Sequence, residues 1–413
     1  MVKDVVIVSA CRTAIGAFGG SLKTIKAPNL GAIVMKEAIK RANIDPKLIQ
    51  DVRFGNCFEP IDSLNIARVS SMLAEIPFSV PAVSINRVCI SAMESVLSGM
   101  WQIQAGFSDI VLAGGVESMS NVPYINEETR WGGRLKDVTL KDGLLHGLHG
   151  GSHFVPFPKD GTGDFKDDYY RGKPYIMGVT AEFLAQKHGF TREQQDEVAL
   201  KSHNQAERAN VEGLFSDEIV PVHIQTRKKE FVFDKDEHFR PGLTMEKLAS
   251  LRPAFIPKVG TVTAGNSSGI NDGAAAMIIM SAEKADALGI KPLAKITGMG
   301  MGACEPYYMG ESPIPAVKDL LKRTGMKMGD FERIELNEAF ASQYLAVEKG
   351  LGLNRDITNV HGSGIGLGHP VGCTGARIMV TLLYELIHKK LNKGLATLCG
   401  GGGVSMATVL ERL

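Results

Sequence analysis

An alternation of short apolar runs and helical patterns, present twice, limits the fold of this 413-residue chain more than any other feature. In the first copy, residues 5–8, 83–86 and 110–113 are strand-like apolar runs. Apolar residues at helical spacing occur over 30–42 and 91–106. Strands separated by helices of about 10–15 residues are typical of a mainly parallel sheet covered on both faces. The pattern therefore predicts an α/β fold.

The second copy lies near the end of the chain. Residues 358–398 have the same order as residues 83–113: a strand, a turn with a reactive side chain, a helix, a strand and then glycines. The strand and turn at 334–339 likewise resemble those at 52–57. Because active sites favour the C-terminal ends of parallel strands, a duplication would bring the two turns together at one interface.

The middle of the chain has a different character, with more charge, aromatic residues and loop signals, and a polar helix expected over 191–211. We expect an inserted loop domain at 119–250. The two halves would then be 1–118 with 251–291, and 292–413. The alternative is a pair of long ordinary loops.

Composition excludes several classes. The 46 Lys and Arg balance 45 Asp and Glu, and a net charge of +1 argues against a nucleic-acid binder with a broad basic field. The sequence contains no run of about 18 apolar residues that would predict a membrane span. The short apolar run at the start is not typical of a signal peptide. The six scattered cysteines are expected to be reduced thiols of a cytoplasmic protein.

Cys89 is the first candidate for chemistry. It stands where a strand ends and an apolar helix begins. The positive end of a helix dipole can lower the pKa of a thiol and favour the nucleophilic thiolate. The alternative is a buried cysteine that packs like a small apolar residue.

Three further candidates lie in the second copy. His369 stands in a glycine-rich run, where a neutral imidazole can accept a proton or donate to an oxyanion. Cys399 precedes four glycines, whose N–H groups can bind an oxyanion, and its thiol can shuttle a proton. Asn337 follows a strand and could hold a water or a carbonyl oxygen. The alternatives are a core histidine, a small residue at a strand end and a helix N-cap.

Two other functions are weaker hypotheses. A zinc site has little support, because no cysteine or histidine pair has the usual spacing and only His146, His149 and His153 cluster; we expect no metal. Residues 298–303 match a dinucleotide-binding glycine pattern after a strand expected at 294–297. However, no helix opens after them to bind a pyrophosphate.

Five ordered motifs resemble those of the thiolase family and run from the N-terminal strand to the last strand. They are Val88-Cys89-x-Ser91-Ala92, the run from Gly265 to Gly273, Asn337-Glu338-Ala339-Phe340, Gly368-His369-Pro370 and Cys399-x-Gly401-Gly402-Gly403. The resemblance implies a duplicated α/β protein with thiolase-like halves in α-β-α-β-α layers. It also implies a loop domain over the site and a homodimer or homotetramer.

The resemblance further implies a ping-pong reaction with coenzyme A thioesters. Cys89 would be the acylated nucleophile, His369 would activate it, and Cys399 would be the acid and base. His369 and a water held by Asn337 would bind one thioester oxygen, and the N–H groups of Cys89 and Gly401 the other. Coenzyme A would be a substrate rather than a permanently bound cofactor.

Contacts with coenzyme A are also implied by the resemblance. Arg240 would lie near the nucleotide and Ser268 on the pantetheine. The tunnel would be lined by Phe255, Met177, Met309, Ala339 and Phe340. The basic residues Arg227, Lys228, Lys229, Arg240 and Lys247 suit an anionic ligand, although the first three are equally typical of a solvated loop.

The expected substrate follows from departures from the family. Acetoacetyl-CoA thiolases commonly have a His-Met-Gly where this chain has Ile176-Met177-Gly178, and the loop at 148–173 is longer than usual. Ala92-Met93-Glu94 also replaces glycine-rich surroundings of the nucleophile. These differences indicate cleavage of a bulky, aromatic or dicarboxylic 3-oxoacyl-CoA such as benzoylsuccinyl-CoA. The chain then resembles benzoylsuccinyl-CoA thiolases, which have a small zinc-containing partner subunit.

Other functions stay open at this point. The first alternative is an acetoacetyl-CoA thiolase, that is, an acetyl-CoA acetyltransferase. A decarboxylating ketoacyl synthase shares the duplicated fold, but Asn337 and Cys399 argue against it. A non-catalytic protein that only binds acyl-CoA is the remaining alternative.

Overall fold

The N-terminal half of the chain is built on one side of a large mixed sheet. The computed structural model describes residues 3–159, 170–226 and 229–413. The strands of this side lie in the order β1 (Val5–Thr13), β11 (Asn271–Ser281), β5 (Ile110–Ser118), β3 (Asp51–Gly55) and β4 (Ala82–Ile85). All residues of β1, β11 and β5 are buried, as expected for strands covered on both faces.

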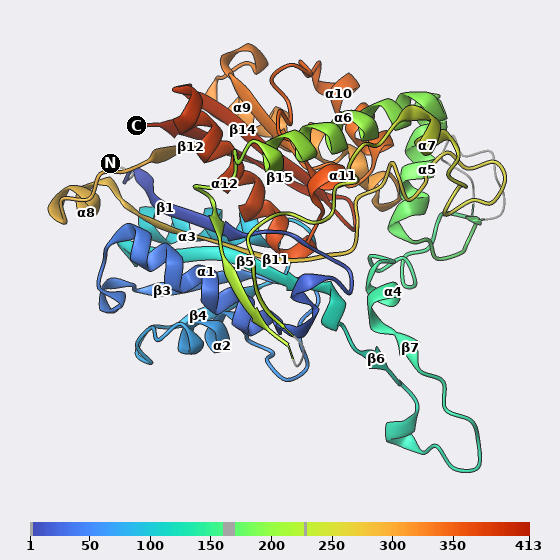
Figure 1. Cartoon of the computed structure of the whole chain (residues 1–413), viewed down its shortest axis with the longest axis horizontal. Coiled ribbons are helices and arrows are strands. Elements are labelled where there is room, and N and C mark those ends of the chain that lie inside the picture. Colours follow the sequence, from blue (N-terminus) through green and yellow to red (C-terminus); the bar gives the residue numbers. More distant parts are fainter. Residues whose placement is uncertain (1–2, 160–169, 227–228) are drawn as a thin grey trace.

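The C-terminal half continues the same sheet. Its strands are β12 (Ala294–Ala303), β15 (Val404–Arg412), β14 (Lys393–Gly400) and β13 (Arg333–Leu336). A two-residue pairing of β1 with β12 joins the halves. The short strands β2 (Gly16–Ala17) and β8 (Ile219–Val220) pair with β11 and β1. Figure 1 shows the blue N-terminal half next to the red C-terminal half.

The two halves repeat one pairing scheme. β3 is parallel to β4 and β5, and β13 is parallel to β14 and to an isolated bridge at Thr358. β5 and β14 then pair antiparallel with β11 and β15. The predicted duplication is therefore confirmed. The expectation of a mainly parallel sheet is wrong, partly because the tight glycine turn after β14 can join only antiparallel strands.

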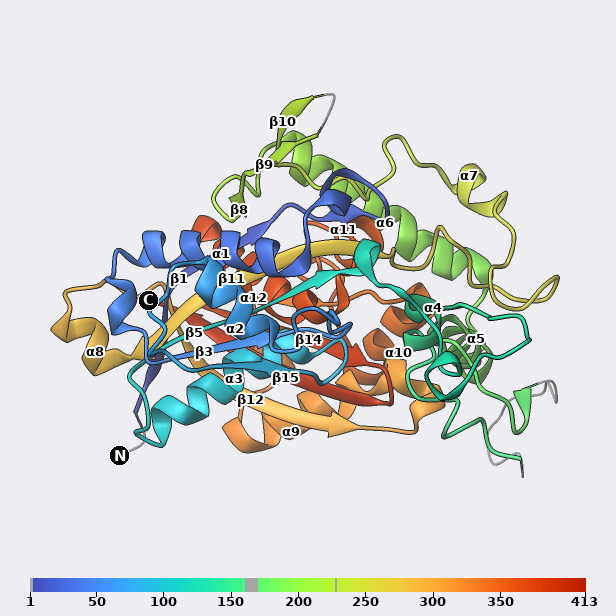
Figure 2. The ribbon, with the colours of Figure 1, turned by 90° about the horizontal axis from the view of Figure 1, so that it is seen from below.

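Helices divide the molecule into layers. α1 (Ala27–Ala42) and α2 (Ile66–Leu73) cover the outer face of the first half, and α9 (Pro313–Thr324) and α10 (Ala341–Leu351) that of the second. Between the halves lie α3 (Ser91–Gln104) and α12 (Val371–Lys389), whose side chains share one buried cluster with strands of both halves. Figures 1 and 2 show this arrangement. The predicted α-β-α-β-α order is confirmed.

The segment between β5 and β11 covers one end of the sheet. Its main helices are α5 (Met177–His188) and α6 (Arg192–Val211), and Thr191 caps α6 through a capping box with Gln194. An arm with β6 (Tyr124–Ile125) and β7 (Lys141–Asp142) extends from the body in Figure 1. The boundaries expected for an inserted domain remain a prediction.

The remaining elements are short connections. They are α4 (Gly143–Gly147), α7 (Met245–Ala249), α8 (Ala282–Ala287), α11 (Gly364–Leu367), β9 (Val222–Gln225), β10 (Glu230–Phe233), and the 3₁₀ helices η1 (Ser21–Thr24), η2 (Pro46–Leu48), η3 (Met119–Asn121), η4 (Thr129–Trp131), η6 (Pro306–Glu311) and η7 (Met328–Asp330).

The glycine pattern at 298–303 is not a nucleotide-binding turn. These residues lie inside β12, which continues to Ala303. A Cβ on Gly300 would lie 2.3 Å from the carbonyl oxygen of Ala316, and one on Gly302 would lie 2.3 Å from its nitrogen. The glycines therefore let α9 pack closely on the strand, and the dinucleotide hypothesis is wrong.

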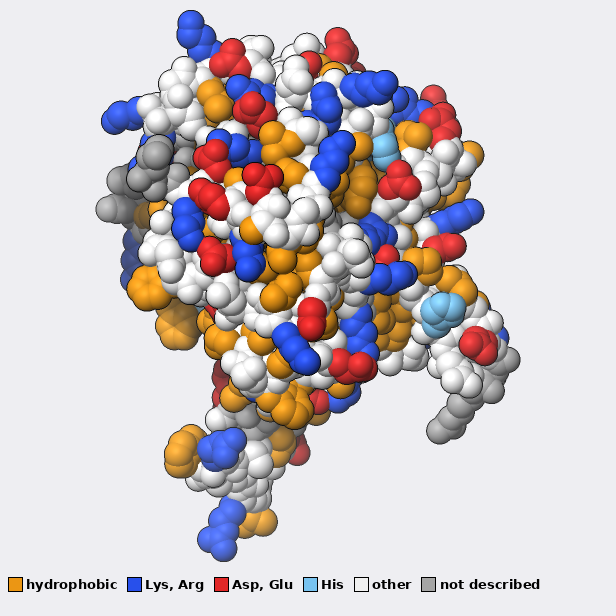
Figure 3. Space-filling model, turned by 90° about the vertical axis from the view of Figure 1, so that its left-hand side faces the viewer, with side chains coloured by type: hydrophobic (Ala, Val, Ile, Leu, Met, Phe, Trp, Pro, Cys, Tyr) orange, Lys and Arg blue, Asp and Glu red, His pale blue; other side chains and the backbone are white. Residues whose placement is uncertain are grey.

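The surface agrees with the balanced composition. Figure 3 shows acidic and basic side chains interspersed over one face. Within the described ranges, no helix combines the length and apolar character needed to cross a membrane.

Candidate active site

Cys89 lies in a strained turn between β4 and α3. The residue before it, Val88, has a φ of +53°, which is unusual for a β-branched side chain. Asn86 Oδ1 accepts the N–H of Val88 at 3.0 Å, and the hydroxyl of Ser91 donates to the carbonyl of Val88 at 2.5 Å. These contacts hold the turn, and such strain is typical of functional sites.

The sulfur of Cys89 is surrounded by apolar contacts and backbone donors. Burial raises the pKa of the thiol to about 11, although hydrogen bonds from the N–H of Gly401 and from its own N–H act to lower it. The charge of Glu117 also raises this pKa. The expectation of a lowered pKa is therefore wrong, because desolvation outweighs the helix N-terminus and the two donors.

His369 is a buried imidazole with a fixed tautomer. Its Nδ1 lies 2.6 Å from the hydroxyl oxygen of Thr374, and that hydroxyl donates to the carbonyl of Pro370 at 2.9 Å. Since the hydroxyl has only one proton, it must accept from Nδ1–H of the neutral imidazole. The Nε2 atom is then the unprotonated ring nitrogen and can accept a proton. Burial, together with the charge of Arg377, lowers the pKa of His369 to about 3 and keeps the ring neutral.

Asn337 lies at the end of β13 beside this imidazole. Its Nδ2 is 3.5 Å from Nδ1 and 3.4 Å from Nε2 of His369, and its buried Oδ1 has no hydrogen-bond partner. Its own N–H donates to the carbonyl of Thr397. The N-cap alternative is wrong, because α10 begins at Ala341 with Phe340 as its N-cap.

Cys399 lies near the end of β14 and is 1% exposed. Burial raises the pKa of its thiol, and the charge of Cys89 raises it further, so the two thiols are within electrostatic reach. Five of the residues expected to line the tunnel share its apolar cluster: Met177, Phe255, Met309, Ala339 and Phe340.

Gly401 lies where the halves and the middle segment meet. A Cβ there would be 3.2 Å from Cγ1 of Val88, 3.4 Å from Sδ of Met177 and 3.8 Å from Cα of Gly150. The absence of a side chain leaves its N–H open toward the sulfur of Cys89.

Ser268 lies in the loop before β11, and Arg240 contacts the same loop. The N–H of Ser268 donates to the carbonyl of Ala339 at 2.9 Å. Arg240 is exposed and donates to the carbonyl of Ala264 at 3.2 Å, so it borders the same loop. Arg227 and Lys228 lie outside the described residues.

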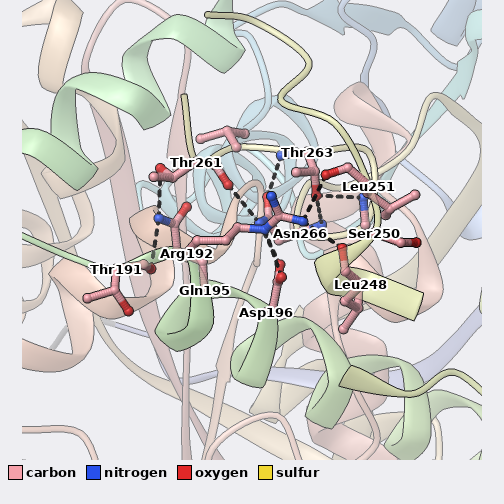
Figure 4. A network of polar contacts seen from close by, with 12 residues as sticks. Thr191, Arg192, Gln195, Asp196, Leu248, Ser250, Leu251, Thr261, Thr263 and Asn266 are labelled. Carbon is pink, nitrogen blue, oxygen red and sulfur yellow. Dashed lines mark hydrogen bonds and ion pairs between the residues drawn. The ribbon is translucent and has the colours of Figure 1, made fainter. Parts of the chain in front are cut away.

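A polar network attaches this loop to α6 (Figure 4). Asn266 donates to Asp196 at 2.9 Å and accepts from the N–H of Thr263 at 2.7 Å. Arg192 binds Asp196 at 2.7 Å. The network fixes the loop whose next residues, Ser267 and Ser268, contact the segment after Asn337.

Sequence reasoning missed three supporting residues. Thr374 fixes the His369 tautomer, and Asn271 Oδ1 accepts the backbone N–H of His369 at 2.9 Å. Glu117 is buried beside the Cys89 turn. Thr374 offered a signal, since it falls in the first turn of the helix that follows His369.

The comparisons agree with this geometry. Residues 5–154 and 163–283 match the family model "Thiolase, N-terminal domain", and residues 290–412 match "Thiolase, C-terminal domain". The chain belongs to the thiolase family. As a thiolase, it is an acyl-CoA C-acyltransferase, and the expected enzyme class is confirmed.

Named relatives cover the whole thiolase chain. The acetyl-CoA acetyltransferase of Escherichia coli (strain K12) is 45% identical, and beta-ketothiolase BktB of Cupriavidus necator is 42% identical, each over 100% of both chains. The crystal structure of human mitochondrial 3-ketoacyl-CoA thiolase in complex with CoA has a TM-score of 0.90 and 37% identity. That match covers 100% of this chain and 98% of the human one.

The cysteines and the histidine cluster at 146–153 form neither disulfides nor a metal site among the described residues. All six cysteines are unpaired with one another. The rings of His146, His149 and His153 have centroids 4.4–6.3 Å apart. Nevertheless, within residues 3–159, 170–226 and 229–413, no group of His, Cys, Asp or Glu side chains could hold a metal ion.

Proposed function

We propose that this thiolase cleaves and forms 3-oxoacyl-CoA through an acyl-enzyme on Cys89, with acetoacetyl-CoA as its substrate. One observation supports this proposal most. The sulfur of Cys89 accepts hydrogen bonds from N–H groups of both halves, and it lies within electrostatic reach of a second thiol, that of Cys399. The unprotonated Nε2 of the His369 imidazole, which lies 3.4 Å from Nδ2 of Asn337, completes the set.

In the cleavage direction, Cys89 attacks the 3-oxo carbon and its proton passes to Nε2 of His369. The bond between C2 and C3 breaks, and the electron pair stays on C2 as the enolate of acetyl-CoA. The thiol of Cys399 protonates C2, acetyl-CoA leaves, and an acyl group remains on Cys89. A neutral starting pair of thiol and imidazole suits this step, because no standing charge must be buried.

The second half-reaction returns the enzyme to its starting state. The Cys399 thiolate accepts the thiol proton of a second coenzyme A, whose sulfur attacks the acyl-enzyme. Cys89 leaves and recovers its proton from His369. Splitting the reaction in this way replaces one difficult step by two easier ones.

Two oxyanion sites would stabilise the charge that develops. The N–H groups of Cys89 and Gly401 would bind the oxygen on the attacked carbon. His369 and a water held by Asn337 would bind the thioester oxygen of the enolate. Each such donor typically contributes about 10²–10³-fold to the rate.

Short-chain substrate use is supported by the named relatives, which are acetyl-CoA acetyltransferases and a beta-ketothiolase. They support the acetoacetyl-CoA alternative better than the bulky substrate expected from the sequence. The residues that share the Cys399 cluster, together with Ser268 and Arg240, are proposed to bind the pantetheine and nucleotide of coenzyme A.

A bulky acyl group remains the second candidate, on one structural observation. A cleft of about 600 Å³ is lined in part by Cys57, Phe58 and Val122, and these three share an apolar cluster with Cys89. Ile176, the residue before Met177, packs against a cluster that contains aromatic residues and adds apolar surface there. Assembly into dimers or tetramers, and a zinc-containing partner subunit, stay predictions.

The test is an assay with free coenzyme A and two substrates, acetoacetyl-CoA and benzoylsuccinyl-CoA. A higher kcat/KM with acetoacetyl-CoA supports the proposal, and a higher kcat/KM with benzoylsuccinyl-CoA supports the second candidate. Failure to cleave either substrate, with no acyl group on Cys89 by peptide mass spectrometry, would reject both.

A further inference from the structure

The carboxylate of Glu117, at the end of β5, collects hydrogen bonds from two parts of the chain. The side-chain amide of Asn56 donates at 2.8 Å, and the backbone N–H groups of Cys57 and Phe58 donate at 2.9 and 3.2 Å. The N–H of Gly372 donates at 2.9 Å. Every partner is a donor, which favours the charged carboxylate, whereas burial of this 0% exposed side chain raises its pKa to about 7.

The fourth donor, the N–H of Gly372, connects the two halves close to His369. Gly372 is the second residue of α12, three residues after His369. A carboxylate at a helix N-terminus is stabilised by the helix dipole as well as by the hydrogen bond. The other three donors follow β3, in the half that carries Cys89. Glu117 therefore ties the helix that begins beside the base to the half that carries the nucleophile.

Close backbone packing leaves little freedom around this tie. A Cβ on Gly372 would lie 2.6 Å from Oε2 of Glu117 and 2.7 Å from Cα of Asn56. One on Gly115 would lie 2.3 Å from the carbonyl oxygen of Gly372. The helix start can approach β5 only because both positions are glycine.

We propose that Glu117 is a positioning residue for the thiolase reaction, which clamps α12, and with it His369, against the half that bears Cys89. This inference rests on the proposed acyl-enzyme function. Since the clamp acts through the placement of the imidazole, its loss lowers kcat more than it raises KM for coenzyme A. Misplacement by about 1 Å is enough to cost roughly 10²-fold in rate.

The charge of Glu117 has a second consequence at the nucleophile. It raises the pKa of the thiols of Cys89, Cys57 and Cys373, in each case after the larger effect of burial. Among the described residues, the ionisable groups whose charges act on or respond to the Cys89 thiol are Glu117 on β5, Cys57 after β3 and Cys399 on β14, and the proposed base His369 is neutral. Above a pH of about 7, where the Glu117 carboxyl is ionised and the thiols are still protonated, Glu117 is the one of these groups that carries a charge, so its removal favours the Cys89 thiolate.

The experiment compares Glu117→Gln with Glu117→Asp in the full chain. The glutamine keeps the size but loses the charge and cannot accept from all four donors. The aspartate keeps the charge but shortens the reach. We expect kcat for 3-oxoacyl-CoA cleavage to fall about 10–100-fold in both, with KM for coenzyme A changed less than about threefold.

Alkylation of Cys89 by iodoacetamide, followed by peptide mass spectrometry, gives a readout that a purely structural role would not move. The pH midpoint should fall by at least about 0.5 unit in Glu117→Gln and stay in place in Glu117→Asp. Gly372→Ala, which forces the helix from the carboxylate without removing charge, should lower kcat and leave the midpoint nearly unchanged. If Glu117→Gln fails to fold, the kcat of Gly372→Ala tests the clamp in its place.

Glu385→Gln is the matched control. Glu385 is a buried carboxylate farther along α12, bound by Arg333 at 2.9 Å and His361 at 2.8 Å. It should lose stability but keep kcat. Wild-type kcat in Glu117→Gln or Gly372→Ala, an unmoved midpoint in Glu117→Gln, or an equal loss of kcat in Glu385→Gln would overturn the proposal. If the wild type cleaves no 3-oxoacyl-CoA, the proposed function fails, whereas the alkylation midpoints still decide the role of the Glu117 charge.

Discussion

The two halves of the molecule share a pairing scheme, but their turns hold reactive groups in different ways. In the first half, Cys89 follows a residue with a left-handed backbone, and its sulfur contacts N–H groups. In the second half, His369 is held by a side-chain hydroxyl and by the amide of Asn271. The duplicated scaffold supplies both turns, and under the proposed function their local contacts suit one to be the nucleophile and the other the base.

Replacing each thiol separately should give the largest difference between the halves. Cys89→Ala should form no acyl-enzyme and lose at least about 10³-fold in kcat. Cys399→Ala should still be acylated by an acyl-CoA but turn over about 10²–10⁴-fold more slowly, since its proton transfer is lost. Peptide mass spectrometry and steady-state assays measure both effects.

Cys11→Ser is the control for this pair. Cys11 lies on β1, and its thiol donates to the carbonyl of Val34 on α1 at 3.3 Å, which a hydroxyl can also do. We expect its kcat to stay within about threefold of wild type. An acyl group found on Cys399 in Cys89→Ala would reverse the assignment of the two thiols.

The next largest effect on kcat is expected from Thr374, whose hydroxyl orients His369. Thr374→Val keeps the shape of the side chain but removes the acceptor for Nδ1–H, so the ring can adopt the other tautomer. We expect kcat to fall about 10–100-fold, whereas Thr374→Ser should retain most of the activity. Equal losses in the two variants would mean that packing, rather than the hydrogen bond, is what matters at this position.

The sequence predicted the order of elements and the motif positions well, because apolar periodicity and glycine turns are local signals. It failed for strand direction, since the antiparallel return of β11 and β15 depends on pairing between distant segments. It also failed for the glycines at 298–303, which match a motif but serve helix packing.

Charge was the least predictable property of the site. A helix start after Cys89 indicated a lowered pKa, yet the buried surroundings raise it to about 11. Burial depends on the assembled halves and the middle segment, none of which a local motif describes. For the same reason Glu117, whose partners lie about 60 and 255 positions away in sequence, gave no sequence signal.

The turns should also differ in how they respond to acid. Burial, followed by the charge of Arg377, lowers the pKa of His369 to about 3, so between that value and about 6.5 only the unfolded chain binds the proton. Stability contributed by the neutral ring is then present above pH 6.5 and lost as the pH falls. From pH 7.5 to 5.5 this loss is about 1.3 kcal/mol.

Urea unfolding of His369→Gln at several pH values measures this contribution. Its free energy of unfolding should fall by about 1.3 kcal/mol less than that of the wild type over the same range. Cys89→Ser is the matched variant from the other turn, and its pH dependence should equal that of the wild type, because a thiol with a pKa of about 11 stays protonated throughout. A wild-type slope in His369→Gln would show that the ring binds its proton equally well in the folded and unfolded protein.

The strained backbone before Cys89 offers the smallest and most specific comparison. Val88→Gly removes a side chain that disfavours the positive φ, which should offset the packing lost against Gly401 and leave stability within about 1 kcal/mol of wild type. Because glycine also loosens the turn, kcat should fall about three- to fivefold, as measured by steady-state cleavage. Lys390→Gly relaxes a similar φ of +54° at the end of α12 and should leave kcat unchanged. If Val88→Gly keeps full activity, the strain is a by-product of the chain path, and the hydrogen bonds of Asn86 and Ser91 alone fix the nucleophile.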